Sequence, residues 1–347
     1  MISVILAGGK GLRLWPESRQ VRPKQLCKFI DNRSMLDHTI DRLTYAGSDK
    51  IIIITSEDLQ ESIESVINQR PDSHKIEVLS EPEGRNTAPA VGLALSKYAT
   101  MTDEVMGIFP ADHHVMDSDG FKDTLQKAIE AARKGHLATV GISPNRPETG
   151  YGYIEKTKWE IGQIPDVYEV KSFCEKPDIE TAQSYLSNGK HLWNAGIYIG
   201  LVDTFVKEFE NHLPDIYGRF SSGLDNYLQS YSNLPDISID YGIAEKCKRM
   251  AVVSGNFGWC DLGSWTALSE LYEPDNDQNI CTGEDIIVLN SKNCIVKQQE
   301  KTVVLYGVND LLLVETDDVI FISDKNKSQE VRSIVNNLQE QMRHDLI

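Results

Sequence analysis

The sequence predicts an α/β fold: a doubly wound, mostly parallel, Rossmann-like sheet followed by a small β-rich domain. Apolar runs of strand length alternate with helix-spaced segments as far as residue 142, and a glycine-rich segment directly follows the first run. From about residue 280 the pattern changes to short β segments. Because helices connect parallel strands, this alternation builds βαβ units with a ligand site at the carboxyl ends of the strands.

The elements before residue 250 follow from these patterns in order. Strands are predicted at 3–6, 51–55, 76–79, 105–109 and 137–142, where short apolar runs occur. Helices are predicted at 35–46, 58–69, 88–99 and 121–134, where apolar residues have helical spacing. Less regular strands follow at 151–156, 167–173 and 195–200, and residues 203–248 are predicted to be mostly helical. These longer insertions should build the second wall of a cleft.

The last part of the chain predicts a small separate domain. Five β segments are expected at IIVLNS, NCIVKQ, KTVVLYG, LLLVET and VIFISD, with a closing amphipathic helix at 328–342. These strands are too few for an independent core and too apolar to face water, so another surface should cover them. We predict a first domain over 1–275 and a second over 276–347.

Composition excludes several classes of partner. The 347 residues include 35 Lys plus Arg and 52 Asp plus Glu, a formal charge of −17, which argues against nucleic acid or an anionic membrane surface. There is no apolar segment long enough to span a bilayer and no basic leader, so we expect a cytoplasmic protein with no membrane partner. The six cysteines form no CxxC pair, so neither a zinc site nor a disulfide framework is indicated.

Positive charge nevertheless concentrates beside the first predicted strand. Residues 10–28 contain six cations, Lys10, Arg13, Arg19, Arg22, Lys24 and Lys28, against the single carboxylate of Glu17. The preceding GGKG allows backbone amides to approach a phosphate closely, because glycine has no Cβ. Its spacing is neither GxGxxG nor GxxxxGK[ST]. From the residues alone, a phosphate site and a tight turn with a solvated basic face both stay open.

A family resemblance narrows these alternatives. "LAGGKGLRLWP" followed by "RPKQ" resembles the signature of sugar nucleotidyltransferases, and in its details that of the mannose-1-phosphate guanylyltransferase family. Seven further blocks resemble the family in order: EPEGRNTAPA, FPADHHV, ETGYGYI, FCEKP, WNAGIYIG, SIDYGIAEK and GWCDLGSW. Together the blocks extend over about residues 2–270.

The resemblance implies a fold of the nucleotide-diphospho-sugar transferase type with a β-helix-like second domain. It implies that mannose 1-phosphate attacks the α-phosphorus of GTP to give GDP-mannose and pyrophosphate, with Mg²⁺ required. Together with the closing helix, it also implies a homodimer, and the alternative is a monomer in which the first domain alone covers the β-rich tail. Because the chain ends at Ile347, we expect none of the isomerase activity of relatives that carry a fused cupin-type domain.

Phosphoryl transfer needs positioning and charge neutralisation more than a nucleophilic side chain. The resemblance places Lys24 beside the triphosphate and Arg13 against the leaving pyrophosphate, and it makes Asp112 and Asp261 the magnesium carboxylates, a donor type that suits Mg²⁺. The plainer alternatives are a helix cap at Asp112 and a turn at Asp261. The expected catalytic residues are Lys24, Arg13, Asp112 and Lys176.

Two binding sets complete the predicted site. The nucleotide set is Leu6, Ala7, Gly8, Gly9, Gly11, Arg13, Lys24, Glu81, Arg85, Asn86 and Thr87, and the sugar-phosphate set is Gly150, Glu175, Lys176 and Asn194. Guanine offers two adjacent donors that a carboxylate can accept together, and Glu81 and Glu83 are the available carboxylates of this block. Asn86 or Thr87 could instead only cap the following helix.

Two other functions stay open from the residues. The same fold could serve another base or sugar, as a thymidylyl-, uridylyl- or adenylyltransferase or a heptose-phosphate guanylyltransferase. A non-catalytic subunit that binds a nucleotide sugar is the other alternative. The presence of Lys24, Asp112, Lys176 and Asp261 together argues against it, because a regulatory subunit needs neither a metal pair nor both lysines.

Overall fold

The computed structural model describes residues 1–9 and 11–347, so Lys10 lies outside the described residues. The chain divides into two compact units. The first unit comprises Met1–Gly8, Thr39–Ala111 and Val115–Trp259, and the second comprises Gly9–His38, Asp112–His114 and Cys260–Ile347. Both units are therefore assembled from separated stretches of chain. The boundary between residues 275 and 276 stays a prediction.

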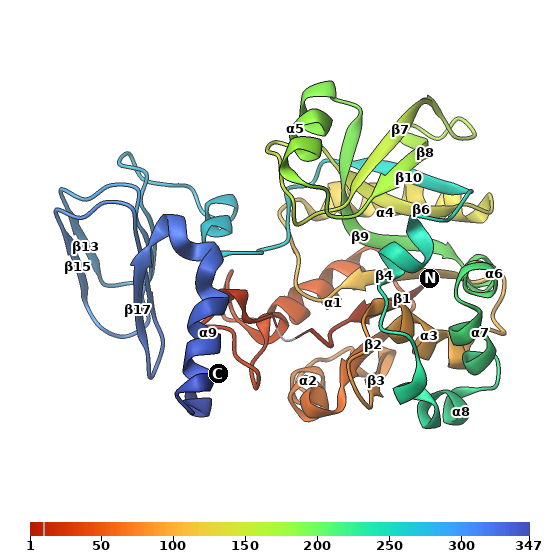
Figure 1. The fold of residues 1–347 in the computed structure, drawn as a ribbon, viewed down its shortest axis with the longest axis horizontal. Coiled ribbons are helices and arrows are strands. Elements are labelled where there is room, and N and C mark those ends of the chain that lie inside the picture. Colours follow the sequence, from red (N-terminus) through yellow and green to blue (C-terminus); the bar gives the residue numbers. More distant parts are fainter. Residues whose placement is uncertain (10) are drawn as a thin grey trace. The chain divides into compact units, whose positions relative to one another are not determined.

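The first unit is built on a nine-stranded sheet with the order β3-β2-β1-β4-β9-β6-β10-β8-β7 (Figure 1). Its strands are β1 (Ile2–Leu6), β2 (Lys50–Ser56), β3 (Ile76–Glu81), β4 (Val105–Pro110), β6 (Leu137–Ile142), β7 (Tyr153–Glu160), β8 (Val167–Cys174), β9 (His191–Leu201) and β10 (Met250–Gly255). The predicted strands up to residue 200 are confirmed within a few residues at each end. The sequence patterns do not predict strand β10.

Pairing within this sheet is mixed. β1 pairs in parallel with β2 and β4, β2 with β3, and β6 with β10. The long strand β9 runs antiparallel to β4, β6 and β7, and β8 runs antiparallel to β7 and β10. The predicted fold class is confirmed, with antiparallel pairing introduced by the strands after residue 150.

Helices cover the sheet of the first unit. They are α1 (Met35–Tyr45), whose first residues belong to the second unit, α2 (Gln60–Asn68), α3 (Thr87–Tyr98), α4 (Ser118–Arg133), α5 (Ile179–Asn188), α6 (Val202–His212), α7 (Pro214–Phe220) and α8 (Leu224–Gln229). A π-helix follows at Asp240–Ala244. The four helices predicted before residue 140 and the helical region at 203–248 are confirmed.

The core of the first unit explains the apolar runs in its sequence. Val4, Ile52 and Ile108 pack in one cluster with side chains of α3, α6, α7 and α8. Ile5 and Ile53, which alternate with them, are also fully buried. Because side chains alternate across a strand, both faces of the sheet are covered. This is why β1 and β2 are continuous apolar runs rather than alternating ones.

The second unit contains the β-rich tail. Its strands are β12 (Ile280–Thr282), β13 (Ile286–Leu289), β14 (Ile295–Lys297), β15 (Val303–Tyr306), β16 (Leu311–Glu315) and β17 (Ile320–Asp324), and its main helix is α9 (Val331–Glu340). β12, β14 and β16 pair in parallel in one sheet, while β13 and β15 pair in parallel in another. The chain thus alternates between two sheets, which is the coil of a β-helix. The five predicted tail strands and the closing helix are confirmed.

The glycine-rich N-terminal segment packs in the same unit as this tail. Trp15 lies edge-on to Phe321 of β17, with ring centroids 5.5 Å apart, and its indole N–H donates to the carbonyl of Leu346 at 2.6 Å. Trp265 is fully buried and donates its indole N–H to the carbonyl of Trp15 at 2.9 Å. One apolar cluster joins these side chains. Residues far apart in sequence therefore share one core.

Two short strands, β5 (His114–Val115) and β11 (Trp259–Cys260), contain points at which the chain passes from one unit to the other. Within residues 1–9 and 11–347, no helix combines the length and the apolar character needed to cross a membrane.

Candidate active site

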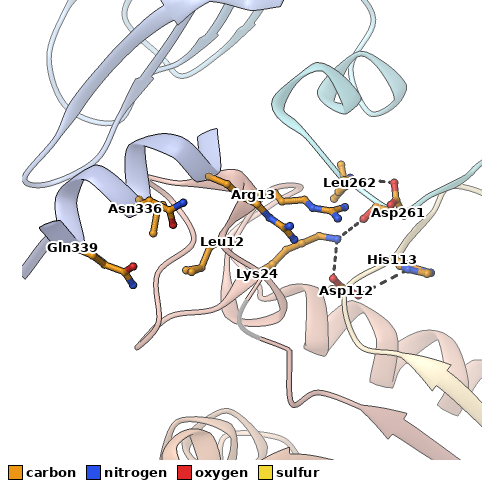
Figure 2. A pocket seen from close by; sticks show the side chains of 13 residues that line it. Leu12, Arg13, Lys24, Asp112, His113, Asp261, Leu262, Asn336 and Gln339 are labelled. Atoms are coloured by element: carbon orange, nitrogen blue, oxygen red, sulfur yellow. Dashed lines mark hydrogen bonds and ion pairs between the residues drawn. The ribbon is translucent and has the colours of Figure 1, made fainter. Parts of the chain in front are cut away.

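A pocket of about 700 Å³ opens in the second unit (Figure 2). Its lining residues are Gly11, Leu12, Arg13, Lys24, Asp112, His113, Asp261, Leu262, Gly263, Arg332, Val335, Asn336 and Gln339. Gly11, Arg13, Lys24, Asp112 and Asp261 were all predicted as site residues, from three separated blocks of sequence. The structure brings these five residues together in one pocket.

Lys24 is the central cation of this pocket. It begins a short 3₁₀ helix, Lys24–Leu26, and only 6% of its surface is exposed. Its amino group donates to the Asp112 carboxylate at 2.8 Å and to the backbone carbonyl of Asp261 (Figure 2). A buried ammonium needs such partners, because an unpaired buried charge is costly. Lys24 therefore contacts the side chain of one predicted metal ligand and the backbone of the other.

Gly11 is required by the close approach of Lys24. Its φ is +53°, in the left-handed region that side chains other than glycine rarely adopt. A Cβ at this position would lie 2.7 Å from the Cβ of Lys24. Glycine here thus serves to bring Lys24 against the backbone of the loop.

The two aspartates differ in their surroundings. Burial alone raises the pKa of Asp112, but the charges of Lys24 and His113 and the hydrogen bond from Lys24 outweigh it, so the pKa lies below its ordinary value. Asp261 accepts a hydrogen bond from the backbone N–H of Gly263 at 3.0 Å and so closes a local turn. Leu262, between them, has a φ of +47°. Such backbone strain in a non-glycine residue is typical of functional sites.

The donor set fits a magnesium ion that binds together with a phosphate substrate. Within the described residues, no cluster of three or more His, Cys, Asp or Glu side chains could hold a metal by itself. Asp112 and Asp261 line one open pocket, and Mg²⁺ usually takes one or two carboxylates and completes its shell with water and substrate phosphates. These two carboxylates match that pattern.

The other cations of the N-terminal segment have different surroundings. Arg13 lines the pocket beside Lys24 (Figure 2). Arg19 forms an ion pair with Asp318 at 2.5 Å, and Arg22 donates to the backbone carbonyl of Glu17 at 3.1 Å. Lys28 lines a separate small hollow of about 160 Å³. The basic segment thus supplies pocket cations at Arg13 and Lys24 and structural contacts at Arg19 and Arg22.

Residues at the end of β1 have backbone roles in the first unit. The amide of Ala7 donates to the carbonyl of Ile54 at 2.7 Å, and the carbonyl of Leu6 accepts from the amide of Ala111 at 3.2 Å. A Cβ at Gly8 would lie 2.8 Å from Oε1 of Glu81. In the second unit, the Gly9 carbonyl accepts from the side-chain amide of Gln25 at 3.0 Å.

Glu81, one of the two candidate carboxylates for guanine, is almost wholly buried at the end of β3. It is 5% exposed, and its Oε2 accepts a hydrogen bond from the Tyr231 hydroxyl at 2.5 Å. Burial raises the pKa of Glu81 to about 7, although the Tyr231 hydrogen bond opposes this. With Gly8 on its other side, the carboxyl group supports the start of the glycine-rich segment.

The rest of this block makes local contacts in the first unit. Asn86, with a φ of +68°, caps α3 by accepting from the amide of Thr87 at 3.0 Å. The Thr87 hydroxyl accepts from the amide of Ile239 at 2.8 Å. Arg85 donates to the carbonyl of Leu234 at 3.0 Å. The capping alternative weighed for Asn86 therefore holds in this structure.

A second polar cluster of the first unit gathers two predicted sugar residues. Lys176 pairs with Oε1 of Glu175 at 2.8 Å and has a φ of +47°. The Glu175 side chain is 7% exposed, and its Oε2 has no hydrogen-bond partner among the described residues. Burial and the nearby charge of Asp240 raise the pKa of Glu175, against the effect of Lys176. A buried carboxylate oxygen without a donor suits a ligand hydroxyl.

Asn194 and Gly150 are already engaged. The Asn194 amide nitrogen donates to the Tyr198 hydroxyl at 2.9 Å and to Asp240 at 3.0 Å, and Asn194 is 9% exposed. The amide of Gly150 donates to the Glu148 carboxylate at 3.1 Å. Both predicted groups thus have internal hydrogen-bond partners.

Sequence reasoning missed several residues of these clusters. Asp240 stands in the block SIDYGIAEK, whose resemblance to the family gave no role to the carboxylate. Tyr198 gave no signal, because a tyrosine in an apolar run resembles core, and Tyr231 gave none, because it stands in the polar stretch QSYSN. Arg332, Asn336 and Gln339 lie in the closing helix, where an amphipathic pattern predicts a solvated polar side.

Two protein-family models match this chain. The family model for nucleotidyl transferases matches residues 2–278, and that for the mannose-phosphate isomerase/GMP-like β-helix domain matches residues 284–338. The chain belongs to the nucleotidyl transferase family. The match spans both units, from β1 through the Asp261 turn.

Three relatives of this nucleotidyl transferase illustrate the likeness. The mannose-1-phosphate guanylyltransferase of Salmonella montevideo is 36% identical over 357 residues, covering 99% of this chain and 75% of the relative. The alginate biosynthesis protein AlgA of Pseudomonas fluorescens is 35% identical over 360 residues, covering 99% and 73%. A crystal structure of mannose-1-phosphate geranyltransferase from Thermus thermophilus superposes with a TM-score of 0.88 at 32% identity, covering 97% of this chain and 99% of the other.

Proposed function

We propose that this nucleotidyl transferase transfers GMP from GTP to mannose 1-phosphate, giving GDP-mannose and pyrophosphate. Relatives named mannose-1-phosphate guanylyltransferase, similar over almost the whole chain, support this assignment. The observation that carries it is Lys24, whose amino group contacts Asp112 and Asp261 inside one open pocket. A cation that contacts the Asp112 carboxylate and the Asp261 backbone, in a pocket that both aspartates line, suits a polyphosphate substrate and its metal.

In the proposed reaction, a phosphate oxygen of mannose 1-phosphate attacks the α-phosphorus of GTP. The bond between this phosphorus and the oxygen bridging to the β-phosphate breaks, and pyrophosphate leaves with the bond electrons. Lys24 and Arg13 bind the phosphates and offset the charge that develops on them. Asp112 and Asp261 would hold Mg²⁺, which when bound neutralises phosphate charge and orients the phosphates. Proton transfer to a side chain is not needed.

The first unit supplies the proposed sugar-phosphate residues. The buried Oε2 of Glu175 would accept a sugar hydroxyl, and the exposed amino group of Lys176 would bind the phosphate. Asn194 holds Asp240 in position, and Gly150 presents its loop. The unsatisfied oxygen of Glu175 supports this role.

Some of the predicted nucleotide-binding residues would shape the loop beside the phosphates, and others would position the segment that contacts guanine. Leu6, Ala7, Gly8 and Gly9 would shape the loop beside the phosphates, while Glu81 would hold Gly8 in place. Arg85, Asn86 and Thr87 would set the position of the segment that meets guanine. Glu81 then affects base choice through its contacts as well as its charge.

We also propose that the chain forms a homodimer through its tail. Side chains on β13 and β15 face outward and are strongly exposed: Ile287 (46%), Leu289 (50%), Val304 (55%) and Tyr306 (71%). These two pairs lie directly opposite each other in the parallel register. An apolar row of this kind supports a covering partner. A cytoplasmic location and the domain division at 275/276 stay predictions from the sequence.

The function is tested by assaying the full chain with Mg²⁺, mannose 1-phosphate and one nucleoside triphosphate at a time. We expect pyrophosphate release and GDP-mannose with GTP, and much slower turnover with ATP, UTP and dTTP. Replacing mannose 1-phosphate by glucose 1-phosphate or a heptose 1-phosphate covers the alternative sugars. A stronger preference for another combination of nucleoside triphosphate and sugar phosphate would assign the chain to that activity. If no combination gave a product, the alternative of a non-catalytic binding subunit would be favoured.

Asp112→Asn tests the metal carboxylate. The variant should fold normally, because asparagine has the same shape, but kcat should fall by about two orders of magnitude or more, since a charge that holds the metal and phosphates is lost. Turnover is measured across a range of Mg²⁺ concentrations. The matched control is Asp318→Asn, which removes a carboxylate paired with Arg19 outside the pocket. Near-normal turnover in Asp112→Asn would remove the proposed metal site.

A further inference from the structure

The closing helix α9 forms one wall of the pocket. Arg332, Val335, Asn336 and Gln339 line the same pocket as Lys24, Asp112 and Asp261. Val335, Asn336 and Gln339 follow Arg332 by three, four and seven residues, so all four side chains lie on one face of the helix. Figure 2 shows Asn336 and Gln339 projecting from α9 toward the side on which Leu12 and Lys24 lie. The tail of the chain therefore contributes side chains to the phosphate pocket.

The position of α9 is set by apolar packing within the second unit. Val331 and Val335 are 2% and 3% exposed and belong to the core cluster that contains Leu14 and Trp15. Because these neighbours follow the glycine-rich segment directly, the helix and the pocket loop share one core. Arg332 follows Val331 in the sequence, so its backbone is anchored beside the cavity.

Arg332 is the cation of α9 that lines the pocket. Within residues 1–9 and 11–347, its side chain forms no ion pair or hydrogen bond, and it is exposed. By contrast, Arg343 just beyond α9 pairs with Asp345 at 2.7 Å. The amino group of Lys24 already contacts both aspartates. An anion entering the pocket would therefore find Arg13 and Arg332 as additional charges.

We propose that α9 completes the binding site for the pyrophosphate half of the nucleotide, with the Arg332 guanidinium contacting the terminal phosphates. Asn336 and Gln339 supply amide N–H donors to the same oxygens. Arginine presents several N–H groups in a planar fork that matches phosphate oxygens. The inference rests on the proposed function, because it names residues for the leaving group of that reaction. It makes the tail a direct part of the site.

The test measures binding and turnover separately. Inorganic pyrophosphate is titrated into the full chain by calorimetry with Mg²⁺ and without sugar phosphate, and KM values are measured for GTP and mannose 1-phosphate. Arg332→Gln should weaken pyrophosphate binding and raise KM for GTP by about tenfold or more, because a charge-assisted contact is lost. KM for mannose 1-phosphate should change less than about twofold. Arg332→Lys, which keeps the charge, should recover part of the loss.

Arg343→Gln is the matched control, because it removes an arginine of the same segment that does not line the pocket. Asn336→Ala provides a second pocket variant, and thermal unfolding checks that every variant is folded. If Arg332→Gln and Asn336→Ala bind pyrophosphate and GTP as the wild type does, the inference is overturned while the proposed function stands. If the wild-type chain neither binds pyrophosphate nor makes a nucleotide sugar, the proposed function fails and the inference fails with it.

Discussion

Lys24 shows how a single residue organises the pocket. It is 6% exposed and contacts Asp112 and Asp261, so its charge is compensated before any substrate binds. Removing one partner of such a buried pair is costly, because the other charge remains without compensation. Arg13 lines the same pocket with an exposed side chain. We infer that Lys24 positions the Asp112 carboxylate and the Asp261 backbone and, together with Arg13, binds the incoming phosphates.

Gly11→Ala should impair the pocket through Lys24. The residue would be held at a φ of +53° with its Cβ 2.7 Å from that of Lys24, so either the loop or Lys24 must move. We expect a loss of about 1–2 kcal/mol in the free energy of unfolding and a fall in kcat/KM for GTP on the order of tenfold to a hundredfold. Denaturant unfolding and steady-state kinetics measure the two effects.

Gly47→Ala is the control for this prediction. Gly47 has a φ of +91°, but a Cβ there would meet nothing within 4 Å. The control should therefore lose stability from backbone strain and keep normal kinetics. Equal kinetic losses in both variants would show that the approach of Gly11 to Lys24 has no special role.

Glu81→Gln should alter the pH dependence of stability. The pKa of Glu81 is raised from 4.5 to about 7 by burial, so between these values the folded state binds a proton that the unfolded state has lost. Wild-type stability from this group is thus present below pH 4.5 and is lost as pH rises through 7. Because glutamine does not titrate, the stability of the variant relative to wild type should rise by about 3 kcal/mol from pH 5 to 8.

Glu77→Gln on the same strand is the opposite control. Burial raises the pKa of Glu77, but hydrogen bonds outweigh this and lower it to about 2, so its contribution is constant above pH 5. Denaturant unfolding at several pH values measures both variants.

The GTP-to-ATP preference of Glu81→Gln is measured as well, and we expect it to fall. An unchanged preference would assign base recognition to another residue of the block.

At the scale of elements, β9 and the π-helix hold one polar network. Asn194 and Tyr198 lie four residues apart on β9, and both hydrogen-bond to Asp240 at the start of the π-helix. Thr139 of β6 donates to the Asn194 oxygen at 3.0 Å. A π-helix is rare and is frequent at functional sites. Here it carries Asp240 to β9, next to the buried Glu175 that the charge of Asp240 affects.

Tyr198→Phe should loosen this network. It removes a hydroxyl that donates to Asp240 at 2.5 Å and leaves the half-buried Asp240 carboxylate less satisfied. We expect a loss of about 1–3 kcal/mol in the free energy of unfolding, with a higher KM for mannose 1-phosphate and an unchanged KM for GTP. Tyr227→Phe removes a buried hydroxyl that donates to Pro89 in the helical core. This control variant should lose similar stability while both KM values stay normal. If KM for mannose 1-phosphate rose as much in Tyr227→Phe as in Tyr198→Phe, the result would argue against a role for the network.

At the scale of the whole molecule, the second unit joins the two ends of the chain. Its core contains Trp15 from the N-terminal segment, Trp265 from the middle of the chain and Phe321 from the tail. Lys297 of β14 pairs with Glu17 at 3.1 Å, and Arg19 pairs with Asp318 of the tail. The basic N-terminal segment therefore packs with tail residues, while the outer apolar row of β13 and β15 stays exposed.

Deletion of residues 281–347 tests this assembly. The truncated chain retains Lys24, Asp112 and Asp261 but loses the packing partners of Trp15 and the α9 wall of the pocket. We expect lower solubility, a lower oligomeric state and strongly reduced turnover. Light scattering after gel filtration and the GTP assay measure these changes. A soluble, active truncation with the oligomeric state of the full chain would show that the tail is an accessory.

Much of the site could be predicted because its residues stand in short blocks that resemble those of the family. Lys24, Asp112 and Asp261 were found in this way, and one pocket contains all three. Arg332 and Asp240 were not found, because a polar residue on an amphipathic helix or in a loop has the same local pattern whether it faces water or a ligand. Glu81 was found, but its burial against Tyr231 and Gly8 depends on contacts between distant segments.

The sequence by itself determined the strands and helices, the fold class and the family, since these depend on local periodicity and on ordered motifs. Only the tertiary structure decided that the glycine-rich segment packs with the tail and that α9 lines its pocket. It also decided which cations of the N-terminal segment pair with tail carboxylates and which line the pocket. The physical reason is that burial and charge pairing depend on which distant segments come into contact, and local sequence patterns do not show those contacts.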